Sequence, residues 1–365
     1  GILTETFAGA GGARSFGDGV DVGGEIPNPI SRMANVETME NSFPMRYLFR
    51  RRMMDSGGAG KYRGGLGMEM ALVPHDAPDG GIHYVIDNKI FNLMPSLKEN
   101  DMAQMRSIKF KSRDGMTLYG YLTIPNQINN NINIPLIVNP HGGPYGIRDF
   151  WGFNPETQLF ANRGYLTLQI NYRGSGGYGK EFYLSGNKQI GRKMLNDLED
   201  GVAFVKTLNL IDNDKIAIYG ASYGGLATLG GLVKTPDLYT CGVDYVGVSN
   251  LFTFFKSFPP YWKPFMGQVY EQWYDENSPE DQEIMKRVSP ALNVDKINKP
   301  LFVVQGANDP RVNINESDQI VENLRERGFD IPYMVKYNEG HGFGHEQNII
   351  ELYKSMMGFF AKHLK

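Results

Sequence analysis

The stretch that decides the fold is residues 216–233, which read IAIYGASYGGLATLGGLV. Its apolar start is typical of a buried strand, and the residues from Leu226 onward are typical of a helix. Between them the pattern G-x-S-x-G surrounds Ser222 with glycines, which keep side chains out of a sharp strand-to-helix turn. Such a turn strains the serine and raises it above the strand's carboxyl end, near a helix N-terminus that favours developing negative charge. We therefore predict that Ser222 is a nucleophile that forms an acyl-enzyme.

Outward from this turn, strand-like runs alternate with amphipathic helical segments. The expected strands are residues 135–139, 165–171, 215–219, 242–248, 300–305 and 332–337, and the expected helices are residues 193–208, 315–327 and 346–364. Two earlier strands, residues 107–112 and 117–124, are expected to pair as a hairpin through a turn at Arg113-Asp114-Gly115. This alternation predicts an α/β fold with a mainly parallel, doubly wound sheet flanked by helices.

A nucleophilic serine needs a base, and the base needs a carboxylate that orients it. On a sheet of this kind the carboxylate follows the serine along the chain and the histidine comes last. Asp309 follows the strand 301–305, and His341 lies in a glycine-flanked loop after the strand 333–337. Both should therefore lie at the carboxyl ends of strands, on the same side of the sheet as Ser222. We predict that Asp309 and His341 complete a catalytic triad.

Other acids and histidines fit the triad less well. His345 and His363 fall at the start and in the last turn of the final helix and are expected to be surface residues. Asp212 and Asp214 precede a strand, so they are expected to be turn residues at the opposite edge of the sheet.

An oxyanion hole of this type takes one N–H from the residue after the serine, here Tyr223, and one from a loop after an early strand. The segment Asn139-Pro140-His141-Gly142-Gly143-Pro144 is such a loop, and its glycines allow the backbone to approach a substrate oxygen. His141 precedes the serine and is expected to shape this loop rather than to act as the base.

Composition excludes several classes of function. The 365 residues carry a formal net charge of −3 without a clustered basic excess, so no nucleic-acid partner is expected. The one dense basic spot, Arg50-Arg51-Arg52, is expected to be a solvated loop. No run reaches the roughly 18 apolar residues of a membrane span, and no signal peptide is visible. The single cysteine, Cys241, is expected to be a small buried hydrophobe. These features favour a cytoplasmic location.

Two further patterns concern ligands. Residues 174–180, GSGGYGK, resemble a phosphate-binding loop, but Glu181 stands where such a loop uses Ser or Thr, so no nucleotide is expected. The six histidines and one cysteine show no metal-ligand spacing, and we expect neither a metal nor a cofactor. The aromatic stretch 252–273 lies in the insertion between two expected strands, where it could form a wall of the substrate pocket. The pocket candidates are Tyr145, Phe254, Tyr261, Trp262 and Trp273.

Five motifs together resemble the catalytic domain of the prolyl oligopeptidase family, acylaminoacyl-peptidase-like members in particular, from about residue 92 to 365. They are NPHGGP at 139–144, NYRGS at 171–175, GASYGG at 220–225, GANDPRV at 306–312 and GHGF at 340–343. The resemblance implies an α/β-hydrolase fold, a triad of Ser222, Asp309 and His341, and oxyanion donors at Gly143 and Tyr223. Members of this family usually carry a β-propeller, for which this chain has neither repeats nor room.

The first part of the chain differs in composition, because it is rich in Gly, Met and Arg. Short strands or loops are expected there, with one strand at about residues 65–73. Residues 7–20, 35–40 and 55–67 are similar to the hydantoinase B subunit family, of which only a fragment is present. We expect residues 1–86 to be this non-catalytic extension, residues 87–106 a linker and residues 107–365 the α/β-hydrolase domain.

Three functions compete at this stage. The preferred one is a carboxylesterase acting on small esters, because the triad cleaves esters and the missing propeller opens the site. The alternative is a peptidase acting on short or N-acylated peptides, as the resemblance implies; no counterpart of the dipeptidyl members' amine-binding acids is identifiable. A catalytically silent binding or assembly protein is the option from another class. Assembly into a homo-oligomer is left open.

Overall fold

The computed structural model describes residues 45–52, 68–74, 101–126, 133–260 and 266–365. The chain divides into two compact units, Gly1–Ser96 and Leu97–Lys365. In the first unit, β1 (Met45–Arg52) pairs antiparallel with β2 (Met68–Pro74), which overlaps the strand expected at 65–73. The expectation of a loop at residues 50–52 is wrong, because these residues continue β1 opposite residues 68–70. The proposed domain boundaries stay a prediction.

The second unit is built on an eight-stranded sheet in the order β10-β9-β8-β7-β5-β6-β4-β3. The strands from β10 to β6 run parallel, while β4 pairs antiparallel with both β6 and β3. The mainly parallel sheet is therefore confirmed, and none of the described residues belongs to a β-propeller. The strands are β3 (Gln104–Lys111), β4 (Thr117–Ile124), β5 (Ile134–Val138), β6 (Leu166–Asn171), β7 (Ile211–Ala221), β8 (Cys241–Tyr245), β9 (Leu301–Gly306) and β10 (Tyr333–Lys336).

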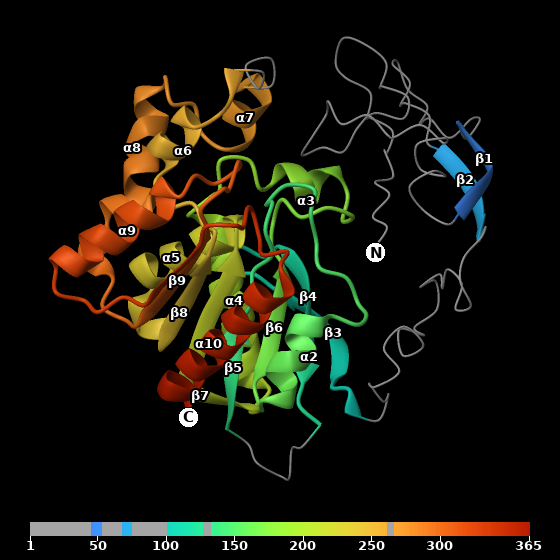
Figure 1. Cartoon of the computed structure of the whole chain (residues 1–365), viewed down its shortest axis with the longest axis horizontal. Helices are drawn as coiled ribbons and strands as arrows, with labels where there is room; N and C mark the ends of the chain where they lie inside the picture. The colour runs from blue at the N-terminus through green and yellow to red at the C-terminus, as the bar shows by residue number, and fades with distance from the viewer. Residues whose placement is uncertain (1–44, 53–67, 75–100, 127–132, 261–265) are drawn as a thin grey trace. The chain divides into compact units, whose positions relative to one another are not determined.

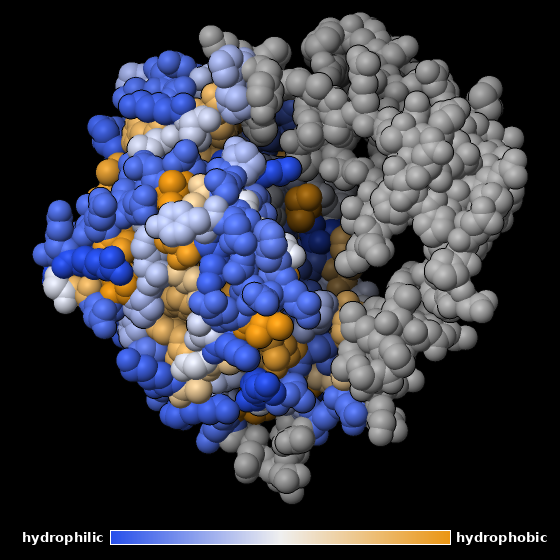
Figure 2. Space-filling model, viewed as in Figure 1, coloured by the Kyte–Doolittle hydropathy of each residue, from blue (hydrophilic) through white to orange (hydrophobic). Residues whose placement is uncertain are grey.

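Helices cover both faces of this sheet (Figure 1). The helices among the described residues of this unit are α2 (Pro155–Asn162), α3 (Lys180–Leu184), α4 (Lys193–Thr207), α5 (Tyr223–Lys234), α6 (Leu251–Lys256), α7 (Met266–Gln272), α8 (Pro279–Val288), α9 (Asn315–Glu326) and α10 (Glu346–Leu364). Successive residues of a strand point to opposite faces of the sheet, so they pack into two separate cores, one on each face. Leu136 and Val138 pack with α4, α5 and α9, whereas Ile137 packs with α2 and α10. The sheet is thus doubly wound. The side of the second unit that Figure 2 shows is mostly hydrophilic, with small apolar patches.

Several strand boundaries differ from the sequence prediction, among them those of β7 and β8. β7 begins at Ile211, so Asp212 and Asp214 lie in its amino end rather than in a turn; they are still at the edge opposite Ser222. β8 ends at Tyr245 because Val246 has a left-handed φ of 48°, which breaks the extended backbone.

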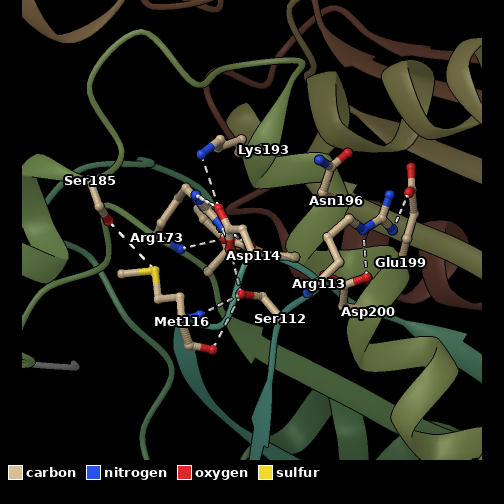
Figure 3. A network of polar contacts seen from close by, with 12 residues as sticks. Ser112, Arg113, Asp114, Met116, Arg173, Ser185, Lys193, Asn196, Glu199 and Asp200 are labelled. Atoms are coloured by element: carbon tan, nitrogen blue, oxygen red, sulfur yellow. Dashed lines mark hydrogen bonds and ion pairs between the residues drawn. The ribbon is translucent and has the colours of Figure 1, made fainter.

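A partly buried ion-pair network ties the β3–β4 turn, the segment after β6 and helix α4 together (Figure 3). Arg173 donates from Nε and Nη2 to Asp197 at 2.9 and 2.7 Å, and from Nη1 and Nη2 to Asp114 at 3.0 Å. Hydrogen bonds from the guanidinium of Arg173 and from the Ser112 hydroxyl hold the pKa of Asp114 well below its usual range. The side chains of Arg173 and Asp197 are only 4% and 0% exposed, so each charge depends on the other for solvation.

Replacing Arg173 by Met is expected to lower the free energy of unfolding by about 3–5 kcal/mol, because the buried Asp197 carboxylate loses its charged partner and keeps only the main-chain N–H of residue 173. Urea denaturation measures this loss. The matched control is Arg113→Met: Arg113 also pairs with two acids, Glu199 and Asp200, but its side chain is 49% exposed. The control should cost about 0–1 kcal/mol. A double variant, Arg173→Met with Asp197→Leu, should recover part of the loss; equal costs for the two single variants would contradict the prediction.

Candidate active site

The nucleophile turn has the strained geometry that its sequence predicts. Ser222 lies between β7 and α5 with φ 60° and ψ −121°, a left-handed conformation that is costly for a residue with a Cβ. Its N–H donates to the carbonyl oxygen of Tyr245 at 2.9 Å, which holds the bend against the end of β8. A Cβ on Gly220 would lie 2.5 Å from Gly224 main-chain atoms, and one on Gly224 would lie 2.3 Å from the carbonyl oxygen of Pro140. Only glycine fits at these two positions.

The predicted acid and base form a pair. Nδ1 of His341 lies 2.7 Å from Oδ2 of Asp309. The other carboxylate oxygen, Oδ1, accepts the N–H groups of Arg311 and Val312 at 2.8 and 2.9 Å. Asp309 is thereby fixed in orientation, and its side chain is fully buried. Because Nδ1 faces the carboxylate, Nε2 of His341 is the nitrogen left to exchange a proton with a reacting group.

The serine and the histidine are linked through Tyr245, a residue that the sequence analysis did not single out. Its carbonyl oxygen accepts the Ser222 N–H, and its hydroxyl accepts the N–H of Phe343, two residues after His341. The two rings pack edge to face, with centroids 5.3 Å apart. Within the described part of the chain no hydrogen bond joins Ser222 to His341; such bonds often tighten only when substrate binds. Tyr245 could have been found from its place at the carboxyl end of the strand beside β7.

The loop that carries His341 is held by a second missed residue, Glu339. Its carboxylate accepts the N–H of Gly344 at 2.8 Å, that of His345 at 3.0 Å and the side-chain amide of Asn348 at 2.7 Å. Burial opposes ionisation of this carboxyl, but these hydrogen bonds outweigh it and lower its pKa to about 2. His345, expected to be a surface residue, is largely exposed and also contacts Glu339. Glu339 therefore joins the histidine loop to the start of α10 as a carboxylate that is ionised at neutral pH.

The predicted oxyanion loop lies against the nucleophile. A Cβ on Gly142 would come 3.5 Å from Cβ of Ser222, and Gly143 has a positive φ of 119°. Tyr223 is the first residue of α5, where main-chain N–H groups lack helical acceptors. His141 is enclosed by the loop, stacked on Tyr172 with ring centroids 4.3 Å apart.

The aromatic pocket candidates fall into three groups. Trp273 packs edge to face against Tyr223, the residue after the nucleophile, with ring centroids 6.2 Å apart, and Phe254 packs against Trp273 at 5.5 Å. Tyr145 is buried, and its hydroxyl donates to the main-chain oxygens of Gly186 and Gln272, so it supports the segment before Trp273. Tyr261 and Trp262 lie outside the described residues.

The described residues contain no group of three or more His, Cys, Asp or Glu side chains placed to hold a metal ion. None of their helices is long and apolar enough to cross a membrane.

Comparison with known families matches both parts of the chain. The model of the prolyl oligopeptidase family matches residues 151–365, and that of hydantoinase B/oxoprolinase matches residues 2–94. Both resemblances expected from the sequence are thereby confirmed.

Relatives and solved structures give the same picture. Dipeptidyl aminopeptidase BIII of Pseudoxanthomonas mexicana is 39% identical over 282 residues, which are 76% of this chain and 41% of that protein. The acylamino-acid-releasing enzyme of Arabidopsis thaliana is 28% identical over 63% of this chain and 30% of its own length. Pyrococcus horikoshii acylaminoacyl peptidase superposes with a TM-score of 0.67 and 26% identity, covering 81% of this chain and 46% of that one. The part of this chain that matches covers 41% and 39% of the lengths of the first two curated relatives, so the chain spans about two fifths of each.

Proposed function

The chain belongs to the prolyl oligopeptidase family, and from that premise we propose that it is a serine hydrolase acting through Ser222, His341 and Asp309. The observation that carries the proposal is the strained Ser222 turn at the same sheet edge as the 2.7 Å Asp309–His341 pair. A strained serine beside an oriented imidazole is the arrangement that nucleophilic acyl transfer needs.

The proposed reaction has two halves. Nε2 of His341 takes the hydroxyl proton of Ser222 while the serine oxygen bonds to the substrate's carbonyl carbon. The N–H groups of Gly143 and Tyr223 stabilise the oxyanion, and the imidazolium then gives its proton to the departing amine or alkoxide. Water attacks the resulting acyl-enzyme by the same route, which releases the acid and restores the serine. Asp309 stays ionised and holds the imidazole throughout.

We propose peptides as the substrate class, short or N-acylated ones in particular. The support comes from the names of the relatives, among them a dipeptidyl aminopeptidase and an acylamino-acid-releasing enzyme. The wall formed by Phe254 and Trp273 beside Tyr223 favours an apolar or aromatic side chain on the acyl part of the substrate.

Carboxylesterase activity is the second candidate. The same triad cleaves esters, and an alkoxide leaves more readily than an amine.

The test compares one acyl group on two leaving groups, a p-nitrophenyl ester and a p-nitroanilide of the same acylated aromatic amino acid. If the protein is a peptidase, it should turn over the anilide at least as fast as the ester. Turnover of the ester alone would support a carboxylesterase instead. A fluorophosphonate probe, mapped by peptide mass spectrometry, should label Ser222. A folded protein that hydrolyses neither substrate and takes up no probe would be the silent binding protein instead.

A further inference from the structure

We propose that Asp244 is a positioning residue that supports the Ser222 turn as a neutral carboxylic acid, and that its ionisation at alkaline pH stops the proposed acyl transfer. This inference deepens the proposed function and rests on Ser222 being the nucleophile. Asp244 lies in β8 opposite Gly220 of β7, two residues before Ser222. The next residue of β8, Tyr245, accepts the Ser222 N–H with its carbonyl oxygen.

The side chain of Asp244 lies between two glycines next to the nucleophile turn. A Cβ on Gly225, in the first turn of α5, would lie 2.3 Å from Oδ1 of Asp244, and one on Gly247 would lie 2.0 Å from the same oxygen. The carboxyl group thus occupies the space that side chains at these two positions would need. Gly225 in turn donates its N–H to the carbonyl oxygen of Ser222 at 2.9 Å. The state of Asp244 therefore acts directly on the first turn of α5.

The surroundings of Asp244 favour the neutral acid. Its side chain is fully buried, and within the described part of the chain neither carboxyl oxygen has a hydrogen-bond partner. A carboxylate in this place would lose its hydration and gain no donor in exchange, which is strongly unfavourable. Burial and the nearby charge of Glu316 raise the pKa of Asp244 to about 8, and the main-chain N–H of Gly247 offsets this rise only in part.

Glu316 of α9 is the second carboxyl in this region, and its surroundings favour the opposite state. Its carboxylate accepts the N–H groups of Ser249 and Asn250 at 2.9 and 2.8 Å, and also the hydroxyl of Thr253. Burial raises the pKa of Glu316 too, but these hydrogen bonds oppose the rise. Because two neighbouring carboxyls resist being ionised together, the donors favour the negative charge on Glu316 and leave the proton on Asp244.

Two tyrosines complete the titratable groups around Asp244. Tyr333 of β10 is near enough for its charge to interact with that of Asp244, and its hydroxyl donates to Asp318 at 2.7 Å. Tyr223 of α5 is fully buried. Burial raises the pKa of both phenols well above the usual value, so both stay neutral over the range in which Asp244 titrates.

A neutral Asp244 suits the chemistry proposed at Ser222. The first turn of α5 is the positive end of the helix dipole, and Tyr223 in this turn is the proposed oxyanion donor. A negative charge on Asp244, beside Gly225 of the same turn, would oppose the negative charge that develops on the substrate oxygen. The uncharged acid fills the same space without this repulsion.

Asp244→Asn keeps the shape of the side chain but cannot ionise. We expect the kcat of the parent to fall above pH 8, about tenfold for each further pH unit, because the neutral fraction of Asp244 falls in that proportion. Asp244→Asn should match the parent within about threefold at neutral pH and keep its kcat to about pH 9.5. The matched control is Asp318→Asn, which removes a partly exposed carboxylate from α9 and should show the same alkaline loss as the parent.

Thermal unfolding gives a readout that needs no activity. Folded Asp244 holds a proton that the unfolded chain releases above about pH 4, so its contribution to stability falls as the pH rises from there to about 8. Asn has no such loss, so the Tm of Asp244→Asn relative to the parent should rise by several degrees between about pH 5 and pH 8. Asp244→Ser is a second neutral variant, to be used if Asp244→Asn does not fold.

A Tm difference that is constant with pH, or that moves in favour of the parent as the pH rises, would overturn the proposal. An alkaline loss of kcat that is absent from the parent, or that remains in Asp244→Asn, would also overturn it. Failure of the proposed function is distinct, because Ser222 would then take up no fluorophosphonate in the parent protein. The Tm comparison would still report the protonation of Asp244 in that case.

Discussion

Replacing Ser222 by Ala is expected to lower kcat by ~10⁶, the loss seen when a serine hydrolase has no nucleophile. No other group takes the place of the Ser222 oxygen at the turn between β7 and α5, so the acyl-enzyme cannot form. Uptake of a fluorophosphonate probe should disappear together with turnover. Substrate binding should persist, because the aromatic wall and the main-chain N–H groups are untouched.

The control for this variant is Ser107→Ala, which removes an exposed serine hydroxyl from β3. It should leave turnover and labelling unchanged. Retention of more than a hundredth of the parent activity in Ser222→Ala, with turnover measured on enzyme free of parent protein, would contradict Ser222 as the nucleophile.

The sequence predicted the architecture of the second unit because its local signals agree with the global fold. The helix predicted at residues 346–364 agrees with α10, because the apolar stripe in the sequence runs over the same residues as the helix. The hairpin of β3 and β4 follows from Asp114-Gly115 at its turn. Errors arose where tertiary context decides: β7 extends to Ile211 through two aspartates that a propensity argument places in a turn.

The sequence predicted those residues of the site that belong to recognisable motifs. Ser222, Asp309 and His341 each follow a strand, and the parallel sheet brings the latter two to a 2.7 Å contact. Tyr245 and Glu339 were missed because they act through a main-chain carbonyl and a buried carboxylate, which no motif reports.

Replacing Asp309 by Asn is expected to lower kcat by ~10⁴, although the two side chains have the same shape. The N–H groups of Arg311 and Val312 both donate to Oδ1 of Asp309, so the amide oxygen of Asn must take that place. Its NH₂ group then faces Nδ1 of His341 as a donor, which forces the imidazole proton onto Nε2. That tautomer cannot take a proton from Ser222.

Three measurements test this account of Asp309. Asp212→Asn, at the opposite end of the sheet, is the matched control and should keep turnover within about twofold, as a surface substitution does. Nitrogen-15 NMR of Asp309→Asn should show the His341 proton on Nε2. The double variant Ser222→Ala with Asp309→Asn should be no slower than Ser222→Ala alone, because residues that act as one unit are not additive. A multiplicative loss in the double variant would mean that Asp309 acts outside the triad, through the loop that it shares with Arg311 and Val312.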